Sequence, residues 1–470
     1  MKANGKVKWI LGSIALLIVI MAVVYPISRK WYPEQEPPKK SQLQRIRERG
    51  YLLAATDKNT LNYFIYRGEA FGYQLNLLES FARSLGVPLR IIASNDIPRL
   101  HYYFYYRVVD ILALNLPVTP ENKKLADFTR ELGETRLVVV QHGDHARKAL
   151  SDFSGDTLYV KSDPYFGAIY RNIVPESGNR LILKEISDTS QIELVKMVSE
   201  GKIGLTLCEE NLAMVLKRTW MNLDAGLVVG KLFPYAWGIH SGSDSLAGLL
   251  NHWIDSIRDQ RALQKITIQY FDNQNVTKYV TGKYSSINNP VISPYDNELR
   301  GLSSLIWWDW RLLASLMYEE SNFMQGQVSQ RNATGLMQMV PETAEKFGLD
   351  STAGPARQIA AGIQYLRWID KQLPKEISDP AERISFILAS YNVGIGRVLA
   401  LRKKAEKFGK DPNRWHGNVE YYLLKRSRQD PYGKTDYPDI FPVNYSTEGY
   451  VDGIITRYYH YRNLIPRDKE

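Results

Sequence analysis

The spacing of apolar residues predicts a helix over residues 310–321. Leu316 and Met317 belong to a set of apolar side chains three or four positions apart, which share one helix face. Glu320 lies four residues after Leu316 and three after Met317, so the same periodicity directs it toward the protein body. Glu319 falls toward the flank. The pattern therefore predicts one glutamate that points inward, beside one that does not.

Residues 42–273 show a different pattern, in which short apolar runs alternate with amphipathic segments. Residues 51–56 and residues 89–94 have the composition of strands, and residues 72–85 between them form an amphipathic helical pattern. Strands that alternate with helices are typical of α/β domains. We therefore expect an α/β domain over residues 42–273.

This alternation stops at residues 274–298, where Asn, Ser, Gly and Pro cluster. We expect a linker there. Residues 299–470 then have a mainly helical composition, which predicts a second domain. Within it, residues 410–445 are rich in Tyr, Arg, Asp and Pro, and we expect them to form a long loop.

The N-terminus carries three lysines and then an apolar run at residues 9–27. A helix of this length spans about 30 Å of hydrocarbon. No Ala-x-Ala cleavage pattern ends the run, and no cysteine follows it directly. We expect residues 1–30 to form an uncleaved membrane-anchor helix and residues 31–41 a spacer, with the rest of the chain exported. An uncleaved anchor favours the inner membrane.

Composition restricts the partners. The net charge is +10, from 60 Lys plus Arg against 50 Asp plus Glu, but the basic residues are scattered along the chain. This distribution does not indicate a nucleic-acid surface; it suits an anionic membrane or cell wall. The single cysteine, Cys208, excludes an intrachain disulfide, and the seven histidines show no metal-binding spacing. We expect no cofactor and no metal.

A carboxyl that burial keeps protonated near neutral pH suits the cleavage of a glycosidic bond, because the leaving oxygen needs a proton. Glu320 is the candidate. The alternative is that Glu319 and Glu320 both decorate a solvated helix end.

The residues around Glu320 resemble the goose-type lysozyme-like domain of the soluble lytic murein transglycosylase family. The resemblance begins with Glu320 and Ser321 and includes the Gly-Leu-Met-Gln turn at residues 335–338. Two departures are Asn332, where the family commonly has glycine, and Val393, where it has alanine. Four segments carry the resemblance, in the family's order: residues 320–344, 358–366, 389–394 and 450–454.

The resemblance implies cleavage of the β-1,4 bond between MurNAc and GlcNAc in peptidoglycan, without water, to give a 1,6-anhydro product. Only one acidic residue is needed, and Glu320 takes the role of acid and base. The alternative for Gln338, as for Met337 and Met339, is ordinary packing around the Gly335 turn. The alternative for Tyr391 and Asn392 is the capping of a helix that ends at Gly394. The candidates for orienting the sugar or the acid are Ser329, Gln338, Tyr391 and Asn392.

Residues 42–271 resemble the extracellular solute-binding protein family 3, on the residues 72–82, 109–112, 119–121 and 128–129. This resemblance implies a two-lobed, periplasmic-binding-protein-like α/β domain that clamps a small ligand. Amino-acid binders of the family use an arginine shortly after a threonine to hold the ligand carboxylate. Asn122 takes that place here. The candidate ligand-binding residues are Thr119, Asn122, Lys123 and Glu209.

A binding-type domain that follows an anchor and precedes a transglycosylase-like domain resembles the membrane-bound lytic murein transglycosylase F family. The resemblance implies peptidoglycan glycan strands as partner, a small ligand or muropeptide in the first domain, and a membrane-associated protein that faces the periplasm. It favours the outer membrane. Two alternatives stay open: a hydrolytic muramidase that uses the same acid, and a non-catalytic sensor that binds the wall.

Overall fold

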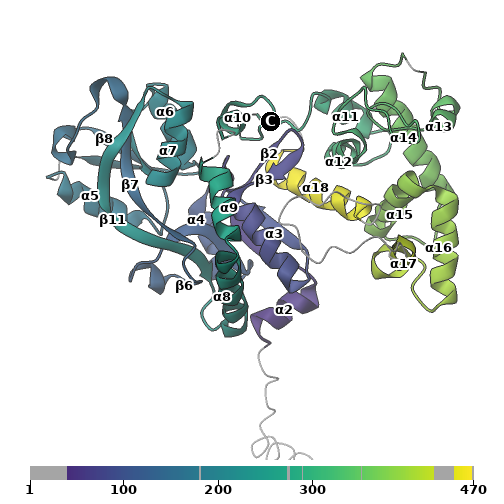
Figure 1. The fold of residues 1–470 in the computed structure, drawn as a ribbon, viewed down its shortest axis with the longest axis horizontal. Coiled ribbons are helices and arrows are strands. Elements are labelled where there is room, and N and C mark those ends of the chain that lie inside the picture. The colour runs from purple at the N-terminus through teal and green to yellow at the C-terminus, as the bar shows by residue number, and fades with distance from the viewer. Residues whose placement is uncertain are drawn as a thin grey trace, which may run out of the picture. The chain divides into compact units, whose positions relative to one another are not determined.

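The computed structural model describes residues 40–178, 181–272, 276–287, 289–350, 352–427 and 449–467 (Figure 1). The chain divides into two compact units, residues 1–49 and 50–470. The first unit contributes helix α2 (Gln42–Arg49). The expected anchor at residues 1–30 lies outside the described residues. Among the residues described, no helix combines the length and the apolarity that a membrane crossing needs.

The second unit begins with the α/β domain, whose main sheet has nine strands (Figure 1). Eight of them lie in the order β4-β1-β5-β11-β7-β10-β8-β9, and β6 pairs with β11. The strands are β1 (Leu52–Thr56), β4 (Leu89–Ala93), β5 (Ile111–Pro117), β6 (Asp127–Phe128), β7 (Gly133–His142), β8 (Thr157–Lys161), β9 (Ile182–Ile186), β10 (Leu205–Glu209) and β11 (Leu223–Ile239); β2 (Phe64–Tyr66) and β3 (Glu69–Phe71) form a separate hairpin.

The pairing of the strands gives the domain its two lobes. In the first lobe β1 pairs in parallel with β4 and β5, and in the second lobe β10 pairs with β8 in parallel and with β7 antiparallel. The 17-residue strand β11 pairs with β5 of one lobe and with β7 of the other. The helices of this domain are α3 (Tyr73–Leu85), α4 (Ile97–Tyr105), α5 (Gly167–Glu176), α6 (Gln191–Ser199), α7 (Glu210–Thr219), α8 (Asp244–Asp259), α9 (Ala262–Thr267) and α10 (Val276–Thr281).

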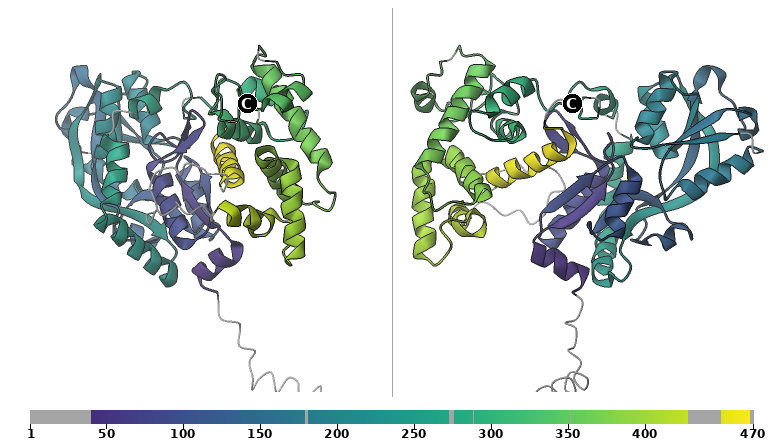
Figure 2. Two further views of the ribbon diagram at one scale, coloured as in Figure 1. Left: turned by 45° about the vertical axis from the view of Figure 1, so that its right-hand side comes forward. Right: turned by 180° about the vertical axis from the view of Figure 1, so that it is seen from behind.

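The remaining part of the unit is helical, and its centre is α12 (Trp310–Ser321), which packs against α18 (Tyr450–Leu464) (Figure 2). The helix α18 also contacts β2, β3 and β4, so the first lobe meets this helical domain through α18. The other helices are α11 (Asp296–Ser303), α13 (Pro341–Lys346), α14 (Pro355–Gln372), α15 (Pro380–Val393), α16 (Ile395–Lys407) and α17 (Glu420–Ser427).

Most elements that the sequence predicts are present with nearly the expected bounds. The helix over residues 310–321 is confirmed, and the strands and helix expected between residues 51 and 94 begin or end within one residue of β1, α3 and β4. The expected loop at residues 410–445 is wrong in part, because residues 420–427 form α17. Residues 428–445 of that expectation lie outside the described residues.

Candidate functional site

The helix α12 holds Glu320 one residue from its C-terminal end. Its N-terminus is capped by Asp309, whose carboxylate accepts a hydrogen bond from the backbone N–H of Arg311. The C-terminal end of α12 is fixed as well, because the hydroxyl of Ser321 donates to the carbonyl of Leu336 at 2.8 Å. Asn322 then ends the helix in the left-handed conformation, at φ 48°.

The apolar face of α12 is buried as its periodicity predicts. Leu313 is 1% exposed, and Leu316 and Met317 are 0% exposed. The polar Ser315 on the same helix is also buried, and its hydroxyl donates to the carbonyl of Ile454 in α18 at 2.7 Å. Packing and hydrogen bonding together hold α12 against α18, which fixes the backbone that carries Glu320.

The carboxyl of Glu320 meets a tyrosine from α18. The hydroxyl of Tyr450 donates a hydrogen bond to Oε1 of Glu320. Burial raises the pKa of Glu320 to about 8; the hydrogen bond from Tyr450 opposes that rise, and the neighbouring Glu319 adds to it. Glu320 is partly exposed. The site thus presents a carboxylic acid that stays largely protonated at neutral pH and remains open to a substrate.

Glu319 has a different environment, although it is the adjacent residue. Its carboxylate forms an ion pair with Arg457 of α18, with Oε2 and Nη2 2.9 Å apart, and both side chains are about one-tenth exposed. The guanidinium of Arg457 also lies over the ring of Tyr318, 4.4 Å from its centroid. The paired Glu319 is therefore a structural contact between α12 and α18.

The turn at residues 335–338 lies against α14 and α15. The Tyr391 hydroxyl donates to the carbonyl of Met337 at 2.7 Å, and Glu320 contributes to a pKa of Tyr391 that burial raises well above the ordinary value. Gly335 has a φ of +77°, which a glycine adopts readily. Gln358 of α14 accepts from the N–H of Leu336 at 2.9 Å. Tyr391 thus lies near Glu320 and supports the turn.

The other three predicted sugar-site residues have separate positions. The Ser329 hydroxyl accepts from the backbone N–H groups of Arg331 and Ala333, within its own loop. The Gln338 amide donates to the carbonyls of Gln327 and Gly335. Asn392 is exposed and lines a small cavity together with Tyr450.

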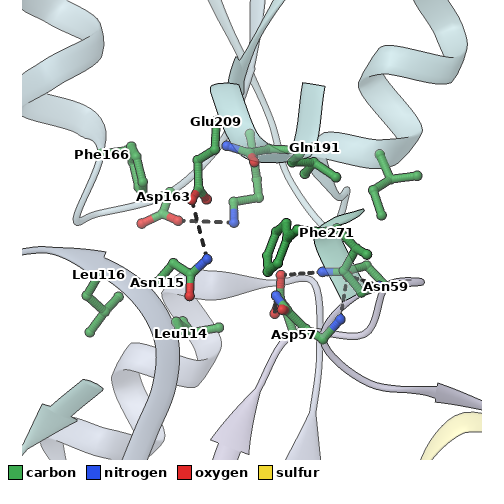
Figure 3. Close-up of a pocket in the computed structure, with 15 residues that line it drawn as sticks. Asp57, Asn59, Leu114, Asn115, Leu116, Asp163, Phe166, Gln191, Glu209 and Phe271 are labelled. Carbon is green, nitrogen blue, oxygen red and sulfur yellow. Dashed lines mark hydrogen bonds and ion pairs between the residues drawn. The ribbon is translucent and has the colours of Figure 1, made fainter. Parts of the chain in front are cut away.

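A second candidate site lies in the cleft between the two lobes of the α/β domain (Figure 3). Its cavity measures about 40 Å³, which is room for a few water molecules. Figure 3 shows Asp57 and Asn59 of the first lobe facing Asp163, Gln191 and Glu209 of the second. A ligand larger than water therefore requires a more open cleft.

Acidic groups outnumber basic groups in this cleft. Lys161 Nζ lies 3.2 Å from Asp163 Oδ2, and both side chains are buried. The Asn115 amide donates to Glu209 at 3.3 Å, and burial raises the pKa of Glu209 to about 7. Asp57 is the third carboxylate. Among the residues that line the cavity there is no arginine. The cleft is short of positive charge.

Of the four ligand-site residues expected from the sequence, Glu209 alone lines the cavity. Asn122 is 2% exposed, and its amide donates to the carbonyls of Pro117 and Tyr165, at 2.8 and 2.9 Å. The hydroxyl oxygen of Thr119 accepts from the N–H of Asn122, and Lys123 is exposed. Asn122 therefore connects the end of β5 to Tyr165 of the second lobe.

Sequence reasoning missed the main partners of both sites. Tyr450 belongs to a segment that the family resemblance identifies, but it is 130 residues from Glu320 and no local pattern connects the two. Asp57 follows β1 directly and Lys161 ends β8. Polar residues at the ends of strands are a signal for a ligand cleft in an α/β sheet, and this signal was available in the sequence.

Two family models match the chain. "Bacterial extracellular solute-binding proteins, family 3" matches residues 52–273, and "Transglycosylase SLT domain" matches residues 307–413. Among solved structures, the P235GK mutant of ArgBP from T. maritima is 17% identical, with a TM-score of 0.44, over 49% of this chain and 99% of that chain.

Curated relatives cover most of the chain. A protein of Stutzerimonas stutzeri (strain A1501) named "Membrane-bound lytic murein transglycosylase F" is 31% identical over 404 residues, which are 85% of this chain and 82% of the relative. A protein of Desulfosudis oleivorans with the same name is 26% identical over 94% of this chain and 96% of the relative. The combination of a two-lobed α/β domain with a helical transglycosylase domain, and this likeness along the whole length, show that the chain belongs to the membrane-bound lytic murein transglycosylase F family.

Proposed function

We propose that this protein is a peptidoglycan lytic transglycosylase with Glu320 as its single catalytic acid and base. The observation that carries the proposal is the environment of Glu320: burial raises its pKa to about 8, and the Tyr450 hydroxyl holds its carboxyl in place. The transglycosylase domain match and the names of the relatives support the reaction type.

The proposed reaction needs one carboxyl in two protonation states. The protonated Glu320 gives its proton to the glycosidic oxygen between MurNAc and GlcNAc, and the bond from that oxygen to the muramoyl C1 breaks. The resulting carboxylate then removes the proton of the muramoyl C6 hydroxyl, whose oxygen bonds to C1. This closes the 1,6-anhydro ring, returns the proton to Glu320 and consumes no water.

The surrounding residues position the acid and the sugar. Tyr450 and Tyr391 lie near the carboxyl, and Tyr391 also supports the turn through Met337. We assign Ser329 and Gln338 to holding the loop that borders the site, and Asn392, which is exposed, to contacting the sugar. Residues 299–470 form the catalytic domain in this proposal.

The digestion of purified peptidoglycan by the full chain tests the assignment of Glu320. Glu320→Gln removes the acid at nearly constant volume and is expected to lower the rate by about 100-fold or more. Glu342→Gln, at an exposed position in α13, is the matched control and keeps full activity. Equal rates for Glu320→Gln and the unaltered protein would exclude Glu320 as the acid.

We further propose that residues 42–273 bind a small ligand that carries an amine, such as a muropeptide released from the wall. The support is the charge of the cleft, where Asp57, Asp163 and Glu209 face a single buried lysine. A ligand ammonium group would balance this excess of carboxylates. Residues 274–298, whose helix α10 still contacts α7 of the α/β domain, then lead to the catalytic domain.

The helix α18 provides a route from this ligand-binding domain to the acid. Tyr450 at its start contacts Glu320, whereas Tyr461 and Asn463 near its end donate to the carbonyls of Gly68 and Ile91 in the first lobe, at 2.5 and 2.9 Å. A ligand that changes the first lobe can change the position of Tyr450 through this helix. We propose that ligand binding regulates the cleavage rate in this way.

The proposed location of the protein is a membrane that borders the periplasm. We infer that residues 1–30 attach the chain to a membrane and that the catalytic domain faces the periplasmic wall; relatives named "membrane-bound" support the attachment. An uncleaved anchor corresponds to the inner membrane, and the family resemblance to the outer membrane. Membrane fractionation of the full chain distinguishes the two.

A further inference from the structure

Three side chains with metal-binding donors meet beside the small cavity that Asn392 and Tyr450 line, and one of them, Glu420, lines that cavity too. They are His416, which follows the buried Trp415, Glu420 at the start of α17, and Asp452 in the first turn of α18. His416 Nδ1 lies 3.6 Å from Glu420 Oε2 and 3.4 Å from Asp452 Oδ1. All three donor atoms are within 4.8 Å of one another.

The two distances from His416 suit the coordination shell of a zinc ion. Zn²⁺ binds imidazole nitrogen and carboxylate oxygen at about 2.0–2.2 Å, so neighbouring donors of a tetrahedral shell are about 3.3–3.6 Å apart. The two distances from His416 fall in this range. One neutral imidazole and two carboxylates balance the charge of a divalent cation. The fourth position is available to water, because His416 and Asp452 are about half exposed.

The segment that carries His416 has a defined backbone conformation. Gly417 adopts a φ of +67°, which turns the chain directly after the histidine. The Lys410 ammonium donates to the Gly417 carbonyl at 2.7 Å, and the Asn418 side chain accepts from the N–H of Asp411 at 3.1 Å. These bonds fix the turn, so little reorganisation is needed to bring the imidazole to an ion.

The location of the three residues gives the ion a structural consequence. Glu420 and Asp452 lie on opposite sides of residues 428–448 in the sequence, so an ion would connect α17 to α18 across that interval. Asp452 is two residues after Tyr450, whose hydroxyl contacts Glu320. An ion held here would therefore fix the start of the helix that positions the catalytic acid.

We propose that His416, Glu420 and Asp452 bind a divalent transition-metal ion, with Zn²⁺ preferred, and that this ion holds α18 to the turn before α17. The site differs from the sequence expectation of no metal, since that expectation rested on cysteine content and on the spacing of histidines. In the sequence, the local signal of a metal site is the pair His416 and Glu420, which are four residues apart. Asp452 comes from a distant helix.

Equilibrium dialysis of the full chain with Zn²⁺, after treatment with a chelator, tests the site. We expect saturable binding, and a loss of affinity of about 10-fold or more in His416→Ala and in Asp452→Asn. His142→Ala is the matched control, because His142 Nδ1 also faces a carboxylate, at 3.3 Å from Asp144, but has a single such partner in the described structure. This variant is expected to bind zinc as the unaltered chain does.

Thermal unfolding gives a second readout that does not depend on activity. Zn²⁺ is expected to raise the Tm of the unaltered chain and of His142→Ala, and to leave that of His416→Ala unchanged. Zinc binding that survives in both His416→Ala and Asp452→Asn would overturn the proposal, as would the absence of saturable binding in the unaltered chain. Neither result bears on Glu320, which the digestion assay tests separately.

Discussion

The carboxyl of Glu320 has a pKa of about 8 because the protein largely surrounds it, and the Tyr450 hydroxyl limits the rise by donating to it. Two neighbouring glutamates therefore have different chemistry. Glu319 is neutralised by Arg457, whereas Glu320 meets no cation in the described structure and keeps its proton. The difference arises from which face of α12 each side chain occupies.

Activity is expected to fall as the pH rises through about 8, because the proposed reaction begins with the protonated form of Glu320. Tyr450→Phe removes a hydrogen bond that favours the carboxylate, so the alkaline midpoint should move upward. The rate near neutral pH should also fall by roughly 10-fold, since the acid loses its positioning contact. A pH–rate profile of both proteins checks this. An unchanged midpoint in Tyr450→Phe would contradict the account.

Stability should depend on pH through the same residue. The folded-state pKa of Glu320 lies above its ordinary value of 4.5, so the folded state favours the protonated form, and stability is lost as the pH rises from about 4.5 through about 8. Glu320→Gln cannot ionise. At pH 9 the variant is expected to have a higher Tm than the unaltered chain. At pH 5 the difference in Tm between the two proteins should be smaller. A Tm difference that is independent of pH would argue against a buried, titrating carboxyl.

At the level of elements, periodicity predicted α12 and the inward direction of Glu320, because both depend on residues three and four apart. The roles of Ser329 and Gln338 depend on loop geometry instead. Their side chains donate to or accept from nearby backbone groups, and Gln338 has a φ of +43°, which no spacing rule reveals. The same holds for Asn122, whose amide connects two segments that the sequence separates.

Helix α14 approaches the turn at residues 335–338 closely at Gly362. A Cβ atom at Gly362 would lie 2.7 Å from Met337 Cε and 2.8 Å from its Cγ. Gly362→Val should therefore push the turn that Tyr391 supports, lowering the Tm and the cleavage rate together; the expected destabilisation is about 1–3 kcal/mol. Thermal unfolding and peptidoglycan digestion measure the two effects.

Gly301→Ala in α11 is the control for this change. Nothing lies within 4 Å of a Cβ atom at Gly301. Alanine has the higher helix propensity, so this variant should be as stable as the unaltered chain or slightly more stable. A Gly362→Val protein with normal Tm and rate would mean that the turn tolerates displacement.

For the whole molecule, the sequence was sufficient to predict an α/β domain followed by a helical one, since each has its own hydrophobic period. It was not sufficient to predict that α18 contacts both Glu320 and the first lobe. Tyr450 and Tyr461 are on one helix, but their partners Glu320 and Gly68 lie 130 and 393 residues away in the chain. Contacts of that range depend on tertiary packing.

If α18 transmits regulation, some substitutions should change the effect of the ligand on the cleavage rate without changing the affinity for the ligand. Glu209→Gln removes a carboxylate from the cleft, so it should lower the affinity for an amine-bearing muropeptide. The effect of the muropeptide on the cleavage rate should fall with the affinity. Tyr461→Phe removes the hydrogen bond to Gly68 outside the cleft and should reduce the effect while the affinity is kept. Tyr421→Phe, at an exposed position of α17, is the control. Calorimetry and digestion rates measure the two quantities, and an undiminished response in Tyr461→Phe would exclude this route.

The mass of the products released from peptidoglycan distinguishes a lytic transglycosylase from a hydrolase. The full chain is incubated with purified peptidoglycan, and the soluble muropeptides are weighed by mass spectrometry. A transglycosylase with Glu320 as its one acid and base gives muropeptides lighter by one water molecule than hydrolysis products, and Glu320→Gln releases them at a rate lower by about 100-fold or more. Products of full hydrolytic mass would contradict the account and identify a muramidase instead.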